Sequence, residues 1–275
     1  MSAKKRWLAL PGLSVIFAFA VAPLFIMLYY SFRGDDPVSG FSLEQYVRFF
    51  EKSFYMSLTW STIKNSIYVT LISLIISYPL AYVMAKKLKG LKNIVLILII
   101  IPFFTNQLVR VYSWLIFLQD GGVLESALAS LGLVDGALSI LYTRVAVIIG
   151  LVHAFFPYMV ITIYLALEKL DNSLLEASAS LGASGFETFR KITLPLSKPG
   201  VAAGFLLVFV PCLGTFVEPR ILGGVNGTVI GTVIEDQFFK IYGWNFGAAI
   251  AFILFAMVLL SIGAFTRLGR GSPNG

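Results

Sequence analysis

The segment Glu176-Ala177-Ser178-Ala179-Ser180-Leu181-Gly182, which continues through Arg190 and Lys191 to Leu194-Pro195, decides how the chain is interpreted. It is rich in polar and small residues, and it lies between two strongly apolar runs. A chain that crosses a bilayer has little reason to keep so ordered a polar interval between two spans unless another molecule docks there. The segment therefore indicates a contact site for a soluble partner.

The composition places the chain in a membrane. Hydrophobic residues make up 58% of the sequence and charged residues 13%, with a mean hydropathy of +0.86, whereas a soluble domain carries about 25% charged residues. The single cysteine, Cys212, excludes an intrachain disulfide, and the single histidine, His153, excludes a histidine-rich metal site. We therefore expect no metal. The net charge of +7 comes from basic residues at the ends of apolar runs, which indicates membrane topology and no nucleic-acid partner.

Six apolar runs are long enough to cross the hydrocarbon core, which takes about 20 residues. The first is interpreted as an uncleaved span, because it is too long for the apolar region of a signal peptide. We expect an all-α membrane protein of six transmembrane helices, forming a single domain over residues 1–275. The predicted spans are residues 7–32, 63–85, 94–118, 145–167, 201–222 and 244–265.

Lysine and arginine set the orientation, because they concentrate on the cytoplasmic side of membrane proteins. Most of them lie in the amino terminus, the 86–93 turn, the 169–200 loop and the carboxyl tail. These four segments share one side of a six-span topology. The chain is therefore expected to be a multi-pass protein of the bacterial inner membrane with both termini in the cytoplasm.

Within the cytoplasmic loop, apolar residues recur at roughly helical spacing: Leu174, Leu175, Leu181, Phe186 and Phe189. Gly182 and Gly185 interrupt this pattern, and Pro195 and Pro199 close it. The pattern predicts a short helix, a turn and a second short helix. Gly182 would supply a backbone bend that a side chain would obstruct.

The loop also resembles a known family motif. Glu176-Ala177-Ser178, three residues, Gly182, nine residues, Ile192, one residue and Leu194-Pro195 is similar to the EAA loop of ABC importer permeases, with Ser178 where the family usually has a second alanine. The resemblance implies that residues 169–199 form a coupling helix in a groove of an ATPase, and it assigns Glu176, Ala177, Ser178, Gly182, Leu194 and Pro195 to that contact. The alternative is a polar loop that only joins two spans.

Four further segments resemble the first membrane subunit of spermidine/putrescine-type permeases: residues 102–112 with Trp114, 194–200, 216–224 and 244–249. The resemblance implies a type I ABC importer built from two permease subunits, an ATPase dimer and a periplasmic solute-binding protein. This chain has no Gly-x-x-x-x-Gly-Lys-Ser/Thr loop to hold nucleotide phosphates. ATP and Mg would therefore bind to the partner ATPase, and this chain is expected to carry no cofactor and to be no enzyme by itself.

Polar residues inside the third span are candidates for the translocation path. Asn106 and Arg110 are one helical turn apart and would share a face. An arginine at the centre of a membrane helix costs about 2.5–3.5 kcal/mol and usually faces the bundle interior or a cavity. The functional reading is a polar stripe with Tyr112 and Trp114 nearby; the alternative is a structural arginine capped by carbonyls or paired with a carboxylate.

Glu218-Pro219-Arg220, near the outer end of the fifth span, is the second candidate. Pro219 would disrupt the helix there, and unwound backbone at that depth is tolerated where it lines protein or water. Related polyamine permeases tend to have an acid in place of Arg220. Either Glu218 replaces that acid for a cationic amine, or Arg220 meets a carboxylate or phosphonate, or the two residues only pair with each other or make separate interface contacts.

The expected function is alternating-access import of a polyamine such as spermidine or putrescine. An opine, another amino acid derivative or an aminophosphonate is the alternative solute within the same importer class. Two other classes remain open. An ion-coupled secondary transporter could use His153, Arg110 and Glu218 as a charged path but would not need the 169–199 loop, and a membrane scaffold subunit would have no path at all.

Overall fold

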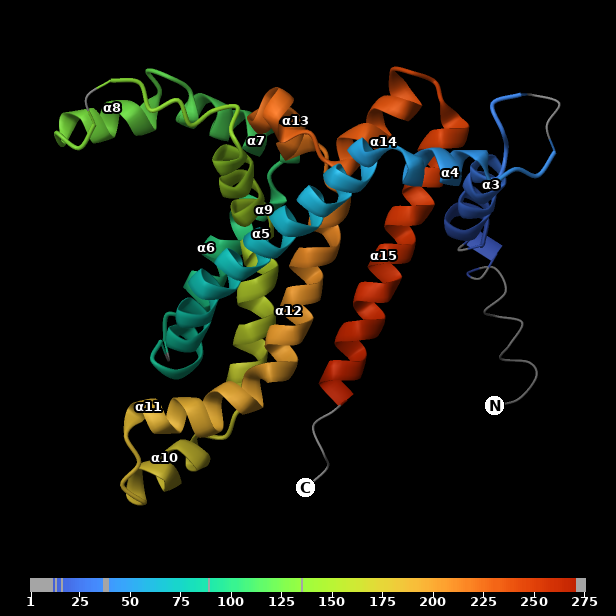
Figure 1. Cartoon of the computed structure of the whole chain (residues 1–275). Helices are drawn as coiled ribbons and strands as arrows, with labels where there is room; N and C mark the ends of the chain where they lie inside the picture. Colours follow the sequence, from blue (N-terminus) through green and yellow to red (C-terminus); the bar gives the residue numbers. More distant parts are fainter. Residues whose placement is uncertain are drawn as a thin grey trace, which may run out of the picture. The chain divides into compact units, whose positions relative to one another are not determined.

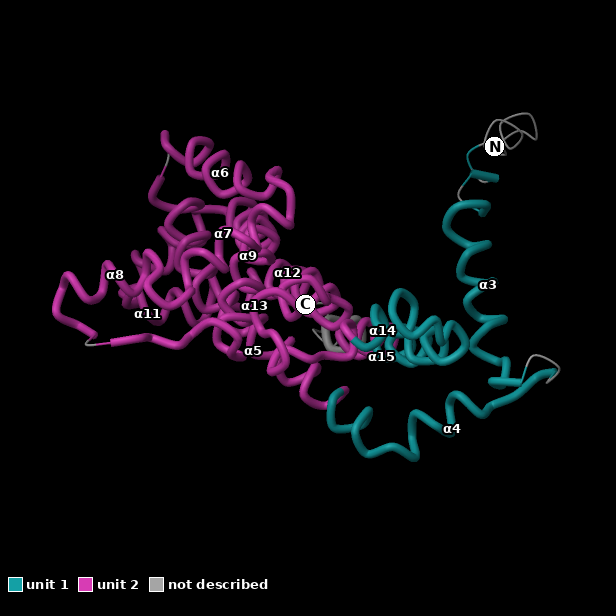
Figure 2. Tube along the Cα trace, turned by 90° about the horizontal axis from the view of Figure 1, so that it is seen from above, with its two compact units in different colours: residues 1–58, 233–257 teal, residues 59–232, 258–275 magenta. Residues whose placement is uncertain are grey.

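The computed structural model describes residues 12, 14–15, 17–36, 40–88, 90–134 and 136–270. Over these residues the chain consists of helices joined by loops, with one isolated β-bridge between Arg33 and Phe41. It divides into two compact units, Met1–Leu58 with Val233–Met257 and Thr59–Thr232 with Val258–Gly275 (Figure 2). The expected all-α class is confirmed.

Four of the described helices are long and apolar enough to cross a membrane. They are α5 (Ser53–Lys86), α9 (Arg144–Glu168), the Gly185–Gly214 segment made of α11 (Gly185–Thr188), η3 (Phe189–Thr193) and α12 (Leu194–Gly214), and the Trp244–Phe265 part of α15 (Trp244–Arg270). A bent pair of helices makes a fifth if the pair is counted as one broken span. It runs through α6 (Lys92–Ile100), η2 (Ile101–Phe104), α7 (Gln107–Leu118) and α8 (Val123–Ser130).

The third predicted span, 94–118, is not one continuous helix. The chain bends by 95° between Phe104 and Gln107. Pro102 lies in the short 3-10 turn before the bend, and Asn106 starts a new helix because its side chain accepts a hydrogen bond from the Leu108 amide at 2.8 Å. A side-chain N-cap of this kind satisfies an amide that would otherwise lack a partner.

The fifth predicted span, 201–222, also has different limits. α12 begins at Leu194 and ends at Gly214, where Thr215 takes an extended conformation. Pro195 lies in the first turn of α12, a position that tolerates proline. The residues after the break form a separate short helix, α13 (Val217–Gly223), followed by η4 (Gly224–Gly227) and α14 (Ile230–Phe239). The second predicted span, 63–85, lies within a helix that begins earlier, at Ser53.

The core of the second unit lies around α9, whose buried residues pack closely against α12 (Figure 1). Gly200 and Gly204 of α12 permit this contact. A Cβ atom at Gly200 would lie 2.7 Å from the Thr162 carbonyl oxygen, and one at Gly204 would lie 2.7 Å from the Met159 sulfur. Small residues at a membrane helix interface allow backbones to approach in this way. In Figure 1, α10 (Asn172–Ser180) and α11 lie at one end of the α9–α12 pair, and α7 and α13 lie at the other.

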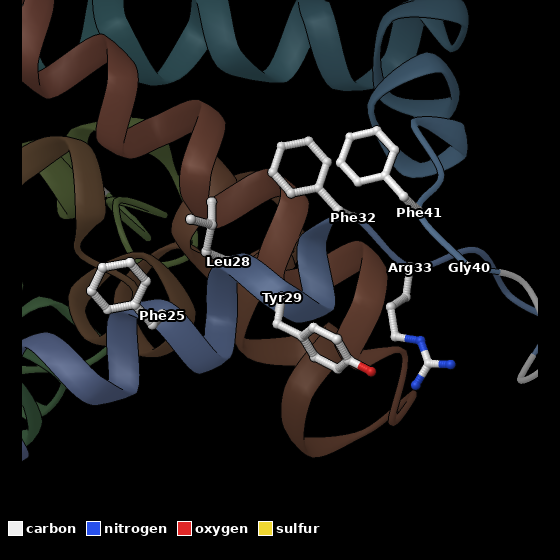
Figure 3. Close-up of a pocket in the computed structure, with 7 residues that line it drawn as sticks. All are labelled: Phe25, Leu28, Tyr29, Phe32, Arg33, Gly40 and Phe41. Atoms are coloured by element: carbon white, nitrogen blue, oxygen red, sulfur yellow. The ribbon is translucent and has the colours of Figure 1, made fainter.

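The first unit contains η1 (Phe17–Val21), α3 (Ala22–Ser31) and α4 (Glu44–Glu51). Part of the predicted first span, residues 7–11, 13 and 16, lies outside the described residues. Beyond α3, the rings of Phe32 and Phe41 stack at 4.8 Å, and the Arg33 side chain points away from them (Figure 3). Gln45 Nε2 ties α4 to the loop after α3 by donating to Asp35, and the Arg48 guanidinium ties α4 to the start of α15, because it lies 4.4 Å from the centre of the Phe246 ring.

Candidate functional site

The 169–199 loop contains one short helix, α10, then a turn, and then α11, which begins the longer Gly185–Gly214 segment. Asp171 begins α10, because its carboxylate accepts a hydrogen bond from the Ser173 amide at 2.9 Å. That backbone hydrogen bond, with a second one from the Ser173 side chain, holds the pKa of Asp171 below its usual value. The predicted short helix and turn are confirmed, but the second helix is not short: from Gly185 the helical segment continues through η3 and α12 to Gly214, and Pro195 and Pro199 lie within it instead of closing it.

Gly182 forms the turn between the two helices with a φ of +78°. Its amide donates to the Ala179 carbonyl at 2.9 Å, and the Ala183 amide donates to the Ser178 carbonyl at 3.1 Å. These two bonds define a Schellman motif, whose left-handed residue is usually glycine. A Cβ at Gly182 would meet nothing within 4 Å, so the backbone conformation and not the space around it requires glycine.

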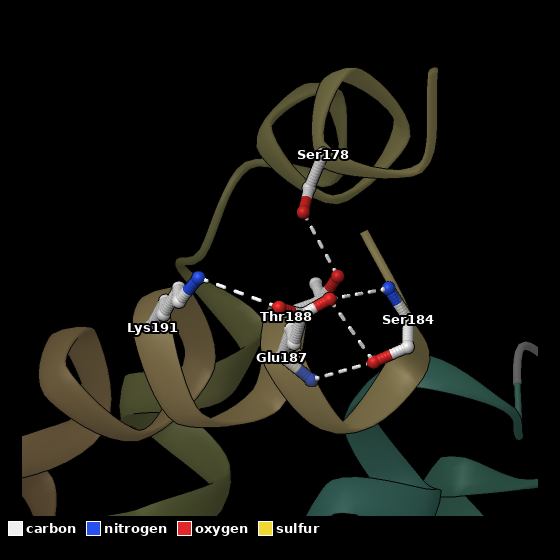
Figure 4. Close-up of polar contacts among 5 residues, drawn as sticks. All are labelled: Ser178, Ser184, Glu187, Thr188 and Lys191. Carbon is white, nitrogen blue, oxygen red and sulfur yellow. Dashed lines mark hydrogen bonds and ion pairs between the residues drawn. The ribbon is translucent and has the colours of Figure 1, made fainter. Parts of the chain in front are cut away.

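Side chains join α10 to α11 (Figure 4). Ser184 and Glu187 form a capping box at the start of α11: the Ser184 amide donates to the Glu187 carboxylate, and the Glu187 amide donates to the Ser184 hydroxyl. Ser178 points from α10 toward Thr188, and their hydroxyl oxygens are 2.8 Å apart. Ser178 is buried at 8% exposure. The Ser178 hydroxyl therefore makes an internal hydrogen bond that an alanine at this position could not make.

The loop is also bound to the ends of two other helices of the same unit. Lys86, the last residue of α5, donates to the Leu170 carbonyl at 2.8 Å and to the Asn172 side chain at 2.9 Å. Lys92, at the start of α6, forms an ion pair with Glu168 at 2.6 Å. The 86–92 turn and the 168–172 segment therefore meet at one end of the unit. Sequence reasoning used these lysines only for topology and did not find their partners.

The outer surface of the loop is exposed. Leu181 is 88% exposed and Phe186 is 71% exposed, although both are large apolar side chains. Glu176 and Ala177 on α10 and Leu194 and Pro195 at the start of α12 are also exposed. Exposed apolar residues rimmed by polar ones are typical of contact surfaces.

The second candidate region brings α7, α12 and α13 together around Glu218, which is only 1% exposed. One carboxylate oxygen of Glu218 accepts a hydrogen bond from Gln107 Nε2 at 3.1 Å, and the other accepts one from the Thr215 hydroxyl at 2.9 Å. Gln107 follows the bend at 105–106, and Thr215 is the break between α12 and α13. Glu218 thus links the two interrupted helices. Sequence reasoning selected Glu218 but not Gln107 or Thr215.

Arg110 lines a separate cavity of about 430 Å³ with Thr105, Val109, Ser113, Trp114, Phe117 and His153. Trp114 Nε1 donates to His153 Nδ1 at 3.1 Å. The structure therefore brings Arg110 and Trp114 together on one wall, together with His153. Tyr112 is 53% exposed and does not line this cavity. The Asn106 side chain caps α7 and does not line the cavity. Its backbone carbonyl accepts a hydrogen bond from the Arg110 amide, one helical turn further along.

Arg220 lies in α13, two residues beyond Glu218, and its Nη2 donates to the Thr232 carbonyl at 3.1 Å. The two charged residues are therefore engaged by different groups. Within the described part of the chain, no cluster of three histidine, cysteine or acidic side chains has the arrangement of a metal site.

Known proteins share both the sequence and the fold. Residues 74–269 match the family described as binding-protein-dependent transport system inner membrane component. The chain is 36% identical over 256 residues to the spermidine/putrescine transport system permease protein PotB of Haemophilus influenzae, covering 92% of this chain and 89% of that protein. It is 38% identical over 263 residues to PotB of Escherichia coli, covering 94% of each.

Two solved structures share the fold at 19% sequence identity. A chain of a bacterial ABC transporter involved in the import of the acidic polysaccharide alginate superimposes with a TM-score of 0.79 over 98% of both chains. A chain of the bacterial alginate transporter in complex with a periplasmic protein bound to alginate pentasaccharide gives a TM-score of 0.76, covering 97% of this chain and 95% of the other.

The family match and the two relatives confirm the resemblance that the loop motif indicated. They also confirm a multi-pass protein of the inner membrane. The chain belongs to the binding-protein-dependent transport system inner membrane components, and it is a permease subunit of an ABC importer.

Proposed function

We propose that this chain forms half of the translocation path of an importer for polyamines such as spermidine or putrescine. The identity of 36–38% to PotB permeases over more than nine-tenths of the chain supports this substrate. The second half of the path would come from another permease subunit. A periplasmic solute-binding protein would deliver the solute to the outer side.

An ATPase dimer would bind ATP and Mg and would contact the 169–199 loop. This step rests on the structure of the loop. Hydrogen bonds within the loop hold α10 against α11 and cap α11, whereas the large apolar side chains of Leu181 and Phe186 are exposed. Glu176, Ala177, Ser178, Gly182, Leu194 and Pro195 would form or shape the contact. The loop side would face the cytoplasm with both termini, because the lysine- and arginine-rich segments share that side.

Rigid attachment would let the loop transmit force. Lys86 ties the start of the loop to α5, and Lys92 ties α6 to Glu168, the last residue of α9 before the loop. The Tyr78 hydroxyl of α5 lies 2.8 Å from that of Ser197 at the start of α12. Closure of the ATPase dimer would therefore move these helices together, and the permease would rock between inward-open and outward-open states. ATP hydrolysis would reset the cycle.

A pair of glycine substitutions tests the coupling role. Gly182→Ala forces alanine into a left-handed conformation, which costs about 1–2 kcal/mol and would reduce the docking-competent loop about 5- to 30-fold. Gly185→Ala is the matched control, because its Cβ also meets nothing within 4 Å and its φ is not positive. We expect binding-protein-stimulated ATP turnover to fall in Gly182→Ala and to persist in Gly185→Ala.

Gly182→Asn refines this test, because asparagine tolerates the left-handed region better than alanine. It should retain more turnover than Gly182→Ala. Turnover at the wild-type level in all three variants would contradict the coupling role of the loop. Uptake that continues in proteoliposomes without any ATPase subunit would instead support an ion-coupled transporter.

A further inference from the structure

Arg110 is half-buried in α7, yet its side chain makes no hydrogen bond or ion pair with any residue that the structure describes. A charged side chain in apolar surroundings is costly to desolvate unless it is paired. Glu218, the buried acid of the same unit, has a different arrangement, because Gln107 and Thr215 already bind both of its oxygens. The guanidinium therefore lacks a counter-ion within the described chain.

The donors that remain available in the cavity in front of Arg110 belong to two residues, Arg110 and His153. The indole of Trp114 can only donate, so His153 Nδ1 is the acceptor of that bond and the proton of the neutral imidazole is on Nε2. The hydroxyl hydrogens of Thr105 and Ser113 are already given to the carbonyls of Pro102 and Val109. Arg110 and His153 thus offer N–H groups in a cavity whose remaining walls are largely apolar. A carboxylate, which only accepts hydrogen bonds, fits this set.

The acids near the same end that the structure describes are engaged elsewhere. Asp120 accepts from the Ser139 amide and Glu125 accepts from the Leu138 amide. A polyamine has no carboxylate and would be repelled by the guanidinium. No acid among the described residues at this end of the unit is therefore left to pair with the guanidinium, and a carboxylate that enters the cavity would belong to another protein chain.

The surface around the cavity indicates which chain this is. α7 exposes a series of large apolar side chains beside Arg110: Leu108, Val109, Tyr112 and Ile116 are each at least 50% exposed. An apolar helix surface with a central, donor-lined cavity suits a second membrane-embedded helix that carries one acid. We propose that the Arg110–His153 cavity receives an aspartate or glutamate side chain of the second permease subunit.

This inference rests on the proposed two-subunit importer and adds a consequence for its substrate. An acid seated on Arg110 neutralises a positive charge beside the bend at 105–106. A cationic solute could then pass this part of the interface without facing an unpaired guanidinium. Arg110 is thus a positioning residue for the subunit interface, acting through its partner acid.

The test uses the full importer, expressed with its second permease, ATPase and binding protein. Arg110→Gln removes the charge, Arg110→Lys keeps it, and Arg144→Gln removes an exposed arginine at the start of α9 that does not line the cavity. Loss of one partner of a buried charge pair should weaken binding of the second permease about thirtyfold or more. We expect this loss in Arg110→Gln, partial retention in Arg110→Lys and normal binding in Arg144→Gln, measured by co-purification in mild detergent.

A charge-reversal screen identifies the partner residue. Arg110→Glu should abolish co-purification, and one acidic-to-lysine substitution in the membrane helices of the second permease should restore it. Tryptophan fluorescence of each variant chain purified alone checks folding, because Trp114 lies in the cavity wall.

Three results would overturn the inference. Normal co-purification and uptake in Arg110→Gln would show that no acid binds there. Normal co-purification with selective loss of uptake of a carboxylate-bearing solute, spermidine uptake being unchanged, would assign the carboxylate to the solute. If the wild-type chain itself fails to bind a second permease, the two-subunit proposal is wrong and the pairing is wrong with it.

Discussion

Glu218 and Arg110 are two ionisable residues in apolar parts of the same unit, and their surroundings differ completely. Glu218 is 1% exposed and has a hydrogen-bond donor on each carboxylate oxygen. Arg110 is half-buried and lacks both hydrogen-bond and ion-pair partners among the described residues. The contrast separates a charge whose partners lie within the chain from one whose partner lies outside it. Substitutions at Glu218 should therefore affect the isolated chain, and those at Arg110 should affect the assembled importer.

The largest expected effect on the isolated chain is that of Glu218→Ala. The change leaves the Gln107 amide and the Thr215 hydroxyl without their acceptor and opens a cavity against Gly150 of α9, which lies beside the Glu218 side chain. Loss of these contacts should lower the free energy of unfolding by about 2–4 kcal/mol. Thermal unfolding of the purified chain in detergent measures this loss.

Arg110→Ala is the matched comparison in the same experiment. Because no described residue binds the guanidinium, the isolated chain should change by less than about 0.5 kcal/mol. Equal destabilisation by the two substitutions would show that Arg110 also has an internal role, and the contrast between the two residues would fail.

Glu218→Gln should have a smaller effect, because the amide can keep both contacts. Its carbonyl oxygen can accept from Gln107, and its NH₂ group can donate to the Thr215 hydroxyl, which is able to accept as well as donate. Unfolding free energy should stay within about 1 kcal/mol of wild type, and spermidine uptake should stay within about fivefold.

Glu218→Gln separates the structural role of this side chain from the role of its negative charge. Unchanged stability with a large loss of uptake would mean that the negative charge itself meets the cationic solute, and Glu218 would then belong to the path. Thermal unfolding and uptake in proteoliposomes should therefore be measured on the same preparation.

Sequence and structure agree best where a local pattern is sufficient. The helix, turn and helix around Gly182 follow from apolar spacing and from a glycine whose left-handed conformation other residues rarely adopt. The bend at 105–106 was missed because hydropathy averaged over the whole apolar run does not reveal a single turn within it. Pro102 followed by Asn106 was a usable signal, since asparagine is a strong N-cap residue.

The Glu218 contacts are of another kind. Gln107 and Glu218 are 111 positions apart in the sequence, and no periodicity relates them. The break at Thr215 was likewise hidden, because the residues on both sides of it are apolar. Only the packing of α13 beside α7 and α9 brings these groups together, so the sequence could identify the acid but not its two donors.

A further small effect is expected in the 169–199 loop, where the same contrast recurs between an internal contact and an exposed surface. Ser178 and Thr188 join α10 to α11 through their hydroxyls, while Leu181 and Phe186 stay exposed. Ser178→Ala, Thr188→Val and the double variant should show a coupling energy of about 0.5–1 kcal/mol, measured from hydrogen exchange of the α11 amides.

Ser180→Ala is the control, because its hydroxyl donates only to the Glu176 carbonyl within α10. Additive effects of the two single substitutions would show that the hydroxyl pair does not hold the helices together, and the loop would then owe its shape to the Gly182 turn and the Ser184–Glu187 cap.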